Sequence, residues 1–312
     1  MSNSMRSIRT ERPAGRRLEV QMSWWGMSGL QGGAAGDTTE DKVRRIAEAG
    51  FDGINGFLPE PAGAQEWKRL LREYGLSFSV NAYPSSVGDL EGFLQRAAAY
   101  GGAIGHVNVQ VMTPFVTGAP AQELLGGLQA LVASYGIDVC IETHRGTATQ
   151  DLLRTVRYVQ ALEDLRLTID FSHYVTAGEM RTVSPEAEAL LGILLTRTSA
   201  IHGRISNGEQ IQVDPGEHGE HEAVPHFVRW WKRGMEYWLN DAGRGVVLPF
   251  VCELGPPPYA ITRDECGERA EELGDRWAQS LWLARTAREL WEEVSRESGG
   301  RDGEGRRGVS ER

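Results

Sequence analysis

The sequence contains Val139-Cys140-Ile141-Glu142, and later Leu167-Thr168-Ile169-Asp170, Ser199-Ala200-Ile201-His202 and Leu248-Pro249-Phe250-Val251-Cys252-Glu253. Each segment is a run of strand-forming residues that ends in a side chain able to bind a metal ion. Helix-type patterns separate the four segments. Four such strand ends in order predict that their side chains meet at one mouth of a barrel of parallel strands.

The same alternation extends over most of the chain. Strand-type runs are predicted at 18–23, 51–57, 76–82, 104–111, 137–142, 167–170, 199–203 and 246–253. Helix-type patterns are predicted at 39–49, 64–74, 90–100, 122–135, 149–162, 185–196, 224–239 and 268–295. Eight alternating units predict an α/β fold, a (β/α)₈ TIM barrel in one domain. An open doubly wound sheet is the alternative, but no GxGxxG follows the first strand.

We assign the barrel to residues 18–297. The lead at 1–17 holds five arginines without an apolar run behind them, so it does not read as a secretory signal. The tail at 298–312 is rich in Gly and charge. Both ends are expected to be disordered, because such segments cannot bury enough apolar surface to offset the entropy of ordering.

The four strand-end side chains form a chemically coherent set. Glu142, Asp170, His202 and Glu253 offer carboxylate and imidazole groups, which suit Mn²⁺, Mg²⁺, Co²⁺ or Zn²⁺. Three converging carboxylates would repel one another without a cation. We therefore predict one divalent metal ion, with Mn²⁺ as the expected one. The alternative is that each acid simply ends a strand and meets solvent.

Residues close to these ends are candidates for substrate contacts. His144 and His173 follow Glu142 and Asp170 on predicted loops, and Arg204 follows His202. Each could instead be an ordinary surface side chain. Asn108 and Trp24, near the ends of earlier strands, could bind a sugar-like ring or hydroxyl, although core packing is the more common fate of Trp.

Composition limits the remaining classes of function. The chain of 312 residues has a formal net charge of −10, which argues against nucleic acid as a partner. No apolar run approaches the ~20 residues of a membrane span. Three cysteines without CxxC spacing suggest a reducing, cytoplasmic location. Trp230, Trp231 and Trp238 could form a homo-oligomer interface, or pack a helix on the barrel.

The motifs resemble the xylose isomerase-like TIM barrels, a superfamily of sugar phosphate isomerases and epimerases. The resemblance rests on Glu142-Thr143-His144-Arg145, Asp170-Phe171-Ser172-His173 and Glu253-Leu254-Gly255-Pro256-Pro257-Pro258-Tyr259, and it spans about Leu18 to Trp291. It implies the four metal ligands, makes Glu142 and Glu253 the acid–base pair, and gives His173 a substrate contact. Ile205 departs from the family, in which an Asp commonly stands three residues after the His ligand.

We therefore expect a metal-dependent isomerase or epimerase acting on a small polyol or sugar-like ketone. Proton abstraction next to a carbonyl, through a metal-stabilised enediolate, would be the central step. A lyase or dehydratase shares that first step and is the alternative. A barrel that binds ligands without catalysis is a third reading, because a fold alone does not imply a function.

Overall fold

The computed structural model describes residues 15–30, 37–101, 104–241, 245–265, 269 and 271–305. Its strands form one closed barrel in the order β1 to β8, and every neighbouring pair is parallel. The strands are β1 (Arg17–Ser23), β2 (Gly53–Gly56), β3 (Ser77–Ala82), β4 (Ile104–Val109), β5 (Asp138–Glu142), β6 (Leu167–Ile169), β7 (Thr198–Gly203) and β8 (Val247–Cys252). The predicted TIM barrel is confirmed.

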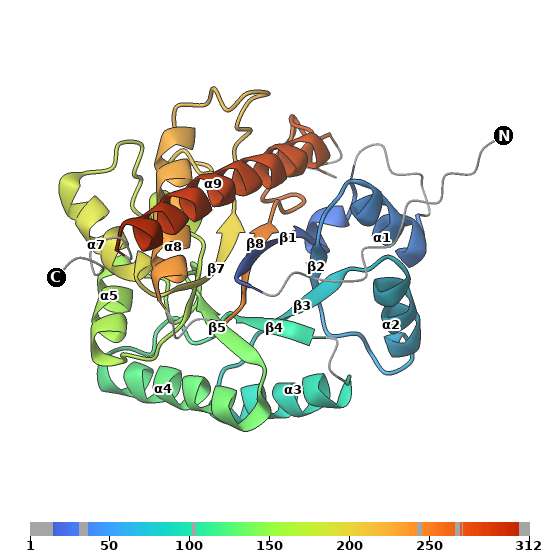
Figure 1. Cartoon of the computed structure of the whole chain (residues 1–312), viewed down its shortest axis with the longest axis horizontal. Helices are drawn as coiled ribbons and strands as arrows, with labels where there is room; N and C mark the ends of the chain where they lie inside the picture. The colour runs from blue at the N-terminus through green and yellow to red at the C-terminus, as the bar shows by residue number, and fades with distance from the viewer. Residues whose placement is uncertain are drawn as a thin grey trace.

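Helices surround the barrel as an outer layer (Figure 1). They are α1 (Thr39–Glu48), α2 (Ala64–Glu73), α3 (Val87–Ala99), α4 (Gly118–Tyr135), α5 (Leu152–Ala161), α6 (Ser172–Ala177), α7 (Pro185–Leu195), α8 (Val224–Asn240) and α9 (Arg276–Gly305). A single 3₁₀ turn, η1 (Trp25–Met27), follows β1. None of the helices in the described ranges is both long and apolar enough to cross a membrane.

Local signals explain where several helices begin and end. Thr38 and Asp41 form a capping box at the start of α1, in which each side chain accepts a hydrogen bond from the other residue's backbone N–H. Gly136 ends α4 with φ of 63°, a left-handed conformation that Gly adopts without strain. The start of α1 and the end of α4 coincide with the predicted bounds at residues 39 and 135.

The start of the last helix differs from the prediction. Helix α9 begins at Arg276 rather than at Glu268, because the Asp275 carboxylate accepts hydrogen bonds from the N–H groups of Trp277 and Ala278 and caps the first turn. The helix continues to Gly305, beyond the predicted boundary at 298. The rest of the predicted tail, most of the predicted lead and Cys266 lie outside the described residues.

Inward and outward faces alternate along the strands. On β4, Val107 and Val109 belong to the hydrophobic core, whereas Asn108 between them is fully buried and hydrogen-bonded to Asn81 and Glu142 on other strands. The interior of the barrel therefore contains polar side chains toward the end where the cluster lies.

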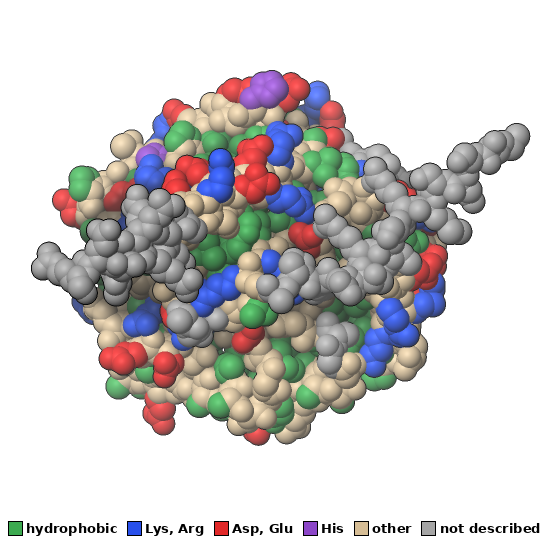
Figure 2. All heavy atoms as spheres, in the orientation of Figure 1, with side chains coloured by type: hydrophobic (Ala, Val, Ile, Leu, Met, Phe, Trp, Pro, Cys, Tyr) green, Lys and Arg blue, Asp and Glu red, His purple; other side chains and the backbone are tan. Residues whose placement is uncertain are grey.

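The tryptophans of α8 belong to the core. Trp230, Trp231 and Trp238 are at most 3 % exposed, and the ring centroid of Trp238 lies 5.8 Å from that of Trp291 in α9. The prediction that these tryptophans pack the helix on the barrel is thus confirmed. The three rings are buried and do not form an exposed surface for a homo-oligomer interface. On the face in Figure 2, acidic and basic side chains are interspersed rather than gathered by sign.

Candidate functional site

The four predicted metal ligands meet inside the mouth of the barrel. Glu142 ends β5, Asp170 follows β6, His202 lies near the end of β7 and Glu253 follows β8. One ligand atom from each residue lies within 4.8 Å of those of the other three, and all four side chains are buried. Because parallel strands in a barrel point the same way, residues distant in sequence converge at their carboxyl ends.

The buried carboxylates are held by two nitrogen-bearing side chains. His202 Nδ1 lies 2.9 Å from Glu253 Oε2 and 3.3 Å from Glu142 Oε1. The Arg204 guanidinium bonds Asp170 Oδ2 through Nε at 3.2 Å and Nη2 at 3.0 Å, and also reaches Glu253 Oε2. Uncompensated burial of three carboxylates would be very costly, so these contacts stabilise the folded state.

The same contacts shift the proton affinities of the cluster. Burial alone would lower the pKa of His202, but the charges of Glu253 and Glu142 outweigh it and raise the pKa well above its usual value. Burial would raise the pKa of Glu142, yet His202, with smaller contributions from His144 and Asn108, outweighs it and lowers that pKa. For Asp170, burial dominates over Arg204 and raises the pKa. The cluster is thus a strongly coupled set of charges.

The donor set fits a divalent cation. Glu142 Oε1 and both ring nitrogens of His202 are buried without a well-formed hydrogen bond to any described residue. Three carboxylates and an imidazole are ligands that Mg²⁺, Mn²⁺, Co²⁺ and Zn²⁺ accept. When His202 is neutral, the positive charge of Arg204 alone does not balance the three carboxylates. A divalent ion would balance the remaining negative charge.

A chain of amide groups fixes the orientation of Glu142. Its Oε2 accepts hydrogen bonds from Asn108 Nδ2 at 2.6 Å and Gln110 Nε2 at 2.9 Å. Asn108 also donates to Asn81, and Asn81 donates to Asn55. With Oε2 engaged on the side of β4, Oε1 is left on the side of His202. The amides thus determine which oxygen is free for an ion or a proton.

Asp170 is oriented in the same way from the other side. Its Oδ1 accepts hydrogen bonds from the backbone N–H and the hydroxyl of Ser172, at the first turn of α6. Its backbone N–H donates to Thr143 Oγ1 at 2.8 Å. Oδ2 therefore faces Arg204 and also lies 3.5 Å from His173 Nε2. Such supporting contacts are typical around metal ligands.

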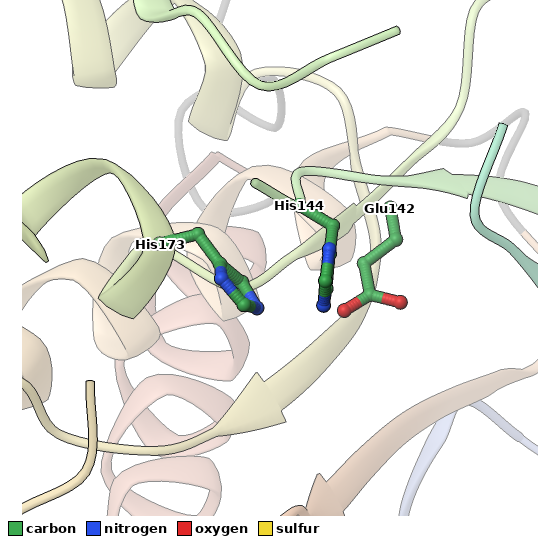
Figure 3. Close-up of side chains that lie close together, drawn as sticks. All are labelled: Glu142, His144 and His173. Carbon is green, nitrogen blue, oxygen red and sulfur yellow. The ribbon is translucent and has the colours of Figure 1, made fainter. Parts of the chain in front are cut away.

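His144 and His173 lie together beside the cluster (Figure 3). Their ring centroids are 3.8 Å apart, and a nitrogen of each ring lies close enough to a Glu142 oxygen for the three to be a possible ligand set. His173 is fully buried, whereas His144 is half-buried. The prediction that both sit on loops is wrong for His173, because α6 begins at Ser172, two residues after Asp170.

Tyr259 covers this side of the site. The guanidinium carbons of Arg204 and Arg145 lie 5.0 Å and 5.1 Å from the centroid of its ring. Trp25 packs against it edge-on at 5.0 Å. The neighbouring Gly255 admits no side chain, because a Cβ there would lie 2.1 Å from the Trp25 ring. The segment after β8 is therefore packed closely onto the mouth.

For one residue, Trp24, the structure differs from the predicted substrate contact, and a second residue, Tyr83, was not predicted. Trp24 lies directly after β1, but its ring packs on Trp67 of α2 at 4.7 Å and is separate from the cluster contacts above. Tyr83, directly after β3, was missed. Its side chain is 47 % exposed, and partial burial of the phenol, followed by the charges of Glu142 and Glu253, raises its pKa. Its position two residues after Asn81 was the available signal.

A cavity of about 870 Å³ lies elsewhere, at the amino-terminal end of the strands. Its lining includes Glu19, His106 and Asp138, which come early in their strands. None of the four predicted ligands lines it. We place the functional site at the cluster, because chemistry in barrels of this kind is carried out at the carboxyl ends of the strands.

Comparison with known proteins agrees with this geometry. The family described as "Xylose isomerase-like TIM barrel" matches residues 43–221, more than half of the chain. The chain belongs to this family. No curated protein sequence matches it.

Solved structures of low identity share the fold. A xylose isomerase-like TIM barrel protein from Mycobacterium smegmatis, in complex with magnesium, has a TM-score of 0.55 at 14 % identity, with 88 % of this chain and 97 % of that chain covered. The probable 3-DHS dehydratase AsbF of Bacillus anthracis, involved in petrobactin synthesis, has a TM-score of 0.52 at 14 % identity and 87 % and 98 % coverage. The AP endonuclease, family 2, from Brucella melitensis has a TM-score of 0.50 at 15 % identity and 76 % and 92 % coverage.

Proposed function

We propose that this xylose isomerase-like barrel is a divalent-metal-dependent isomerase or epimerase of a small polyol or sugar-like ketone. The observation that carries the proposal is the pair Glu142 and Glu253. They come from β5 and the end of β8, contact the same His202 nitrogen and lie in one buried ligand set. Two carboxylates that approach one point from different strands could act on two faces of a bound substrate.

Glu142, Asp170, His202 and Glu253 would hold the ion. A bound divalent ion, with Mn²⁺ expected and Mg²⁺, Co²⁺ or Zn²⁺ also suited, would supply positive charge that makes a carbon next to a substrate carbonyl more acidic. A magnesium-bound neighbour of the same fold supports a metal but does not identify it. Asn108 and Gln110 would keep the Glu142 carboxylate in one rotation.

The chain's own groups would then move the proton. One glutamate takes a proton from the carbon next to the carbonyl, and the other returns a proton to the opposite face (epimerisation) or to the neighbouring carbon (isomerisation). Burial and the hydrogen bonds to Glu142 Oε2 limit this carboxylate to one outward oxygen. His144, His173 and Arg204 would hold substrate oxygens, and the packed segment around Tyr259 would exclude water. Asn108, predicted to contact substrate, would act by positioning Glu142, because its amide N–H groups are engaged by Asn81 and Glu142.

A lyase is the second candidate, because elimination of a β-hydroxyl begins with the same proton abstraction. The family neighbour from B. anthracis, named as a dehydratase, keeps this alternative open. A non-catalytic binding barrel is the third. As further expectations, we infer a cytoplasmic protein that binds neither nucleic acid nor membranes and that could form homo-oligomers.

The first test is metal content, measured by elemental analysis of wild-type protein and the Glu142→Gln/Glu253→Gln double variant. We expect about one ion per chain in the wild type and a large loss in the variant. The metal-loaded protein is then incubated in D₂O with a panel of ketoses, and deuterium incorporation is followed by NMR. Incorporation without elimination supports an isomerase or epimerase, and loss of water from the substrate supports the lyase. Absence of metal binding contradicts both.

A further inference from the structure

We propose that the cavity at the amino-terminal end of the strands is a second binding site, and that its ligand is a small neutral polyhydroxy compound. The cavity has a volume of about 870 Å³, within the roughly 300–1,000 Å³ that is usual for ligand pockets. None of the four residues of the candidate metal cluster lines it. The site is therefore independent of the proposed function.

The cavity exists because inward positions near the start of the strands carry small or polar side chains. Barrels of this kind are usually filled by bulky branched side chains. Here β2 provides Gly53, where a Cβ would lie 2.0 Å from Ser77 Oγ, and β3 provides Ser77 and Ser79. Gln21 of β1 bonds both of these hydroxyls, and Gln21 and Ser77 line the cavity. Its floor is thus polar rather than a packed apolar layer.

A directional chain of hydrogen bonds fixes which atoms the floor presents. Asn81 donates to Asn55, and Asn55 donates to Ser79. Ser79 then donates to Gln21, and Gln21 donates to Ser77 Oγ at 3.3 Å. Because each donor in turn faces the next acceptor, the last hydroxyl accepts a bond and keeps its own proton. No described residue accepts that proton, so Ser77 offers a donor to a bound molecule.

His106 supplies an unpaired ring from β4 to the same cavity. Its side chain is 6 % exposed, and its Nε2 is buried without a hydrogen-bond partner among the described residues. Burial, with a smaller effect of His202, lowers the pKa of the ring to about 3, so at neutral pH it has one donor and one acceptor nitrogen. Buried polar groups are almost always paired, which indicates that a group from outside the chain completes this ring.

The charges of the lining favour a neutral ligand. Glu19 is the one buried charged side chain among the described residues that line the cavity, and it accepts a hydrogen bond from Arg17 at 3.0 Å. The remaining charged side chains are half-buried or exposed: Lys68, Arg72, Asp138 and Arg166. An ion would lose hydration without gaining an unpaired buried counter-charge, whereas hydroxyl groups could pair with the neutral floor.

Other kinds of ligand fit less well. Apolar side chains complete the lining: Leu71, Leu76, Val132, Trp238 and Pro249. The C–H faces of a polyol can pack on such groups, but a purely apolar molecule would leave Ser77 and His106 unpaired. A metal ion is also disfavoured, because within the described part of the chain both sets of potential ligands include Glu142 at the mouth.

Saturation-transfer NMR of the full-length protein tests the site with three ligands that share a six-carbon chain: neutral D-glucitol, anionic D-gluconate and cationic 1-amino-1-deoxy-D-glucitol. We expect glucitol to bind with a Kd on the order of millimolar, and each ion to bind roughly threefold or more weakly. Absence of saturable glucitol binding up to about 100 mM would overturn the site. Tighter binding of either ion would overturn its assignment to a neutral ligand.

Matched variants locate the binding. Gly105 lines the cavity, and a Cβ there would lie 4.0 Å from the nearest atom, so Gly105→Leu should fold, occupy part of the cavity and weaken binding roughly tenfold or more. Gly92→Leu on α3, where a Cβ meets nothing within 4 Å, should keep the wild-type affinity. Ser77→Ala and His106→Leu should each weaken binding about threefold to tenfold, as expected for one lost hydrogen bond.

Binding at the mouth of the barrel is the alternative that must be separated. His173→Gln should leave glucitol binding unchanged if the ligand lies in the cavity. Loss of binding in His173→Gln, with full binding in Gly105→Leu, would place the ligand at the mouth and overturn the inference.

Two thiols give a local check in the wild-type protein. Cys140 lines the cavity, whereas Cys252 is buried outside its lining. Glucitol should slow the modification of Cys140 by methyl methanethiosulfonate, followed by peptide mass spectrometry, and leave the rate at Cys252 unchanged. Equal slowing at both thiols would reflect general stabilisation and would count against a ligand in the cavity.

Discussion

The Nδ1 atom of His202 lies 2.9 Å from Glu253 Oε2 and 3.3 Å from Glu142 Oε1, so one imidazole bridges a carboxylate of β5 and a carboxylate that follows β8. All three side chains are buried. Bridging of this kind is how a folded protein can keep like charges together, because the imidazole, when protonated, offsets their repulsion. The same position is where a cation would be most stabilised.

Metal binding should stabilise the fold. Saturating Mn²⁺ at roughly 100 times its Kd is expected to add about 2.7 kcal/mol to the free energy of unfolding. Asp170→Asn should remove most of this gain by deleting a charged ligand. Asp138→Asn is the matched control, because Asp138 begins β5 and lies at the end of the strand away from Glu142. This variant should keep the gain in stability. Thermal unfolding with and without Mn²⁺ measures it, and equal Tm shifts in both variants would contradict the ligand assignment.

Loss of Arg204 should destabilise the metal-free protein. Arg204 is 1 % exposed and contacts Asp170 and Glu253, so Arg204→Met leaves two buried carboxylates short of a partner. The expected cost is about 3–5 kcal/mol in the free energy of unfolding, from urea titration. Divalent metal should recover part of the loss. Arg69→Met, which breaks an exposed pair with Glu40, should cost about 0–1 kcal/mol. Similar costs for the two variants would refute the role of Arg204.

The Asn108 amide should matter for turnover more than for metal content. Asn108→Leu removes the 2.6 Å hydrogen bond to Glu142 Oε2, a bond to a charged group of about 1.5–3 kcal/mol. The carboxylate could then rotate, so proton exchange into a ketose should slow by roughly tenfold to a hundredfold. Metal content should stay near that of the wild type. A variant with unchanged exchange would show that the amide chain is not needed for positioning.

His106 should make stability depend on pH. Burial, with a smaller effect of His202, lowers the pKa of His106 to about 3, from an ordinary value of 6.5. Between these values the unfolded chain binds a proton that the folded chain does not, so stability is full above pH 6.5 and declines as the pH falls toward 3.

The expected contribution is about 1.4 kcal/mol per pH unit within that window. His106→Gln removes the titrating group, so urea unfolding between pH 6 and 4 should show a shallower decline in the variant than in the wild type. Identical slopes would mean that His106 is protonated in the folded state.

Much of the fold and the ligand set could be predicted from local pattern. The eight strands lie within two residues of their predicted bounds at each end, and the four ligands lie at strand ends as expected. Such features depend on alternation, helix periodicity and turn residues, all of which are local. The short helix α6 was not predicted, because six residues, Ser172–Ala177, carry little periodic signal. The start of α9 depended on a single capping carboxylate at Asp275.

The sequence by itself therefore determined that this chain is a parallel (β/α)₈ barrel with Glu142, Asp170, His202 and Glu253 at one mouth. Only the tertiary structure decided how these groups face one another. It assigned the amide chain through Asn108 to one oxygen of Glu142, the Arg204 guanidinium to Asp170 and Glu253, and the Tyr259 ring to contact with two arginines. The physical reason is that these contacts join residues from different strands and loops, and their distances depend on closure of the barrel rather than on any local pattern.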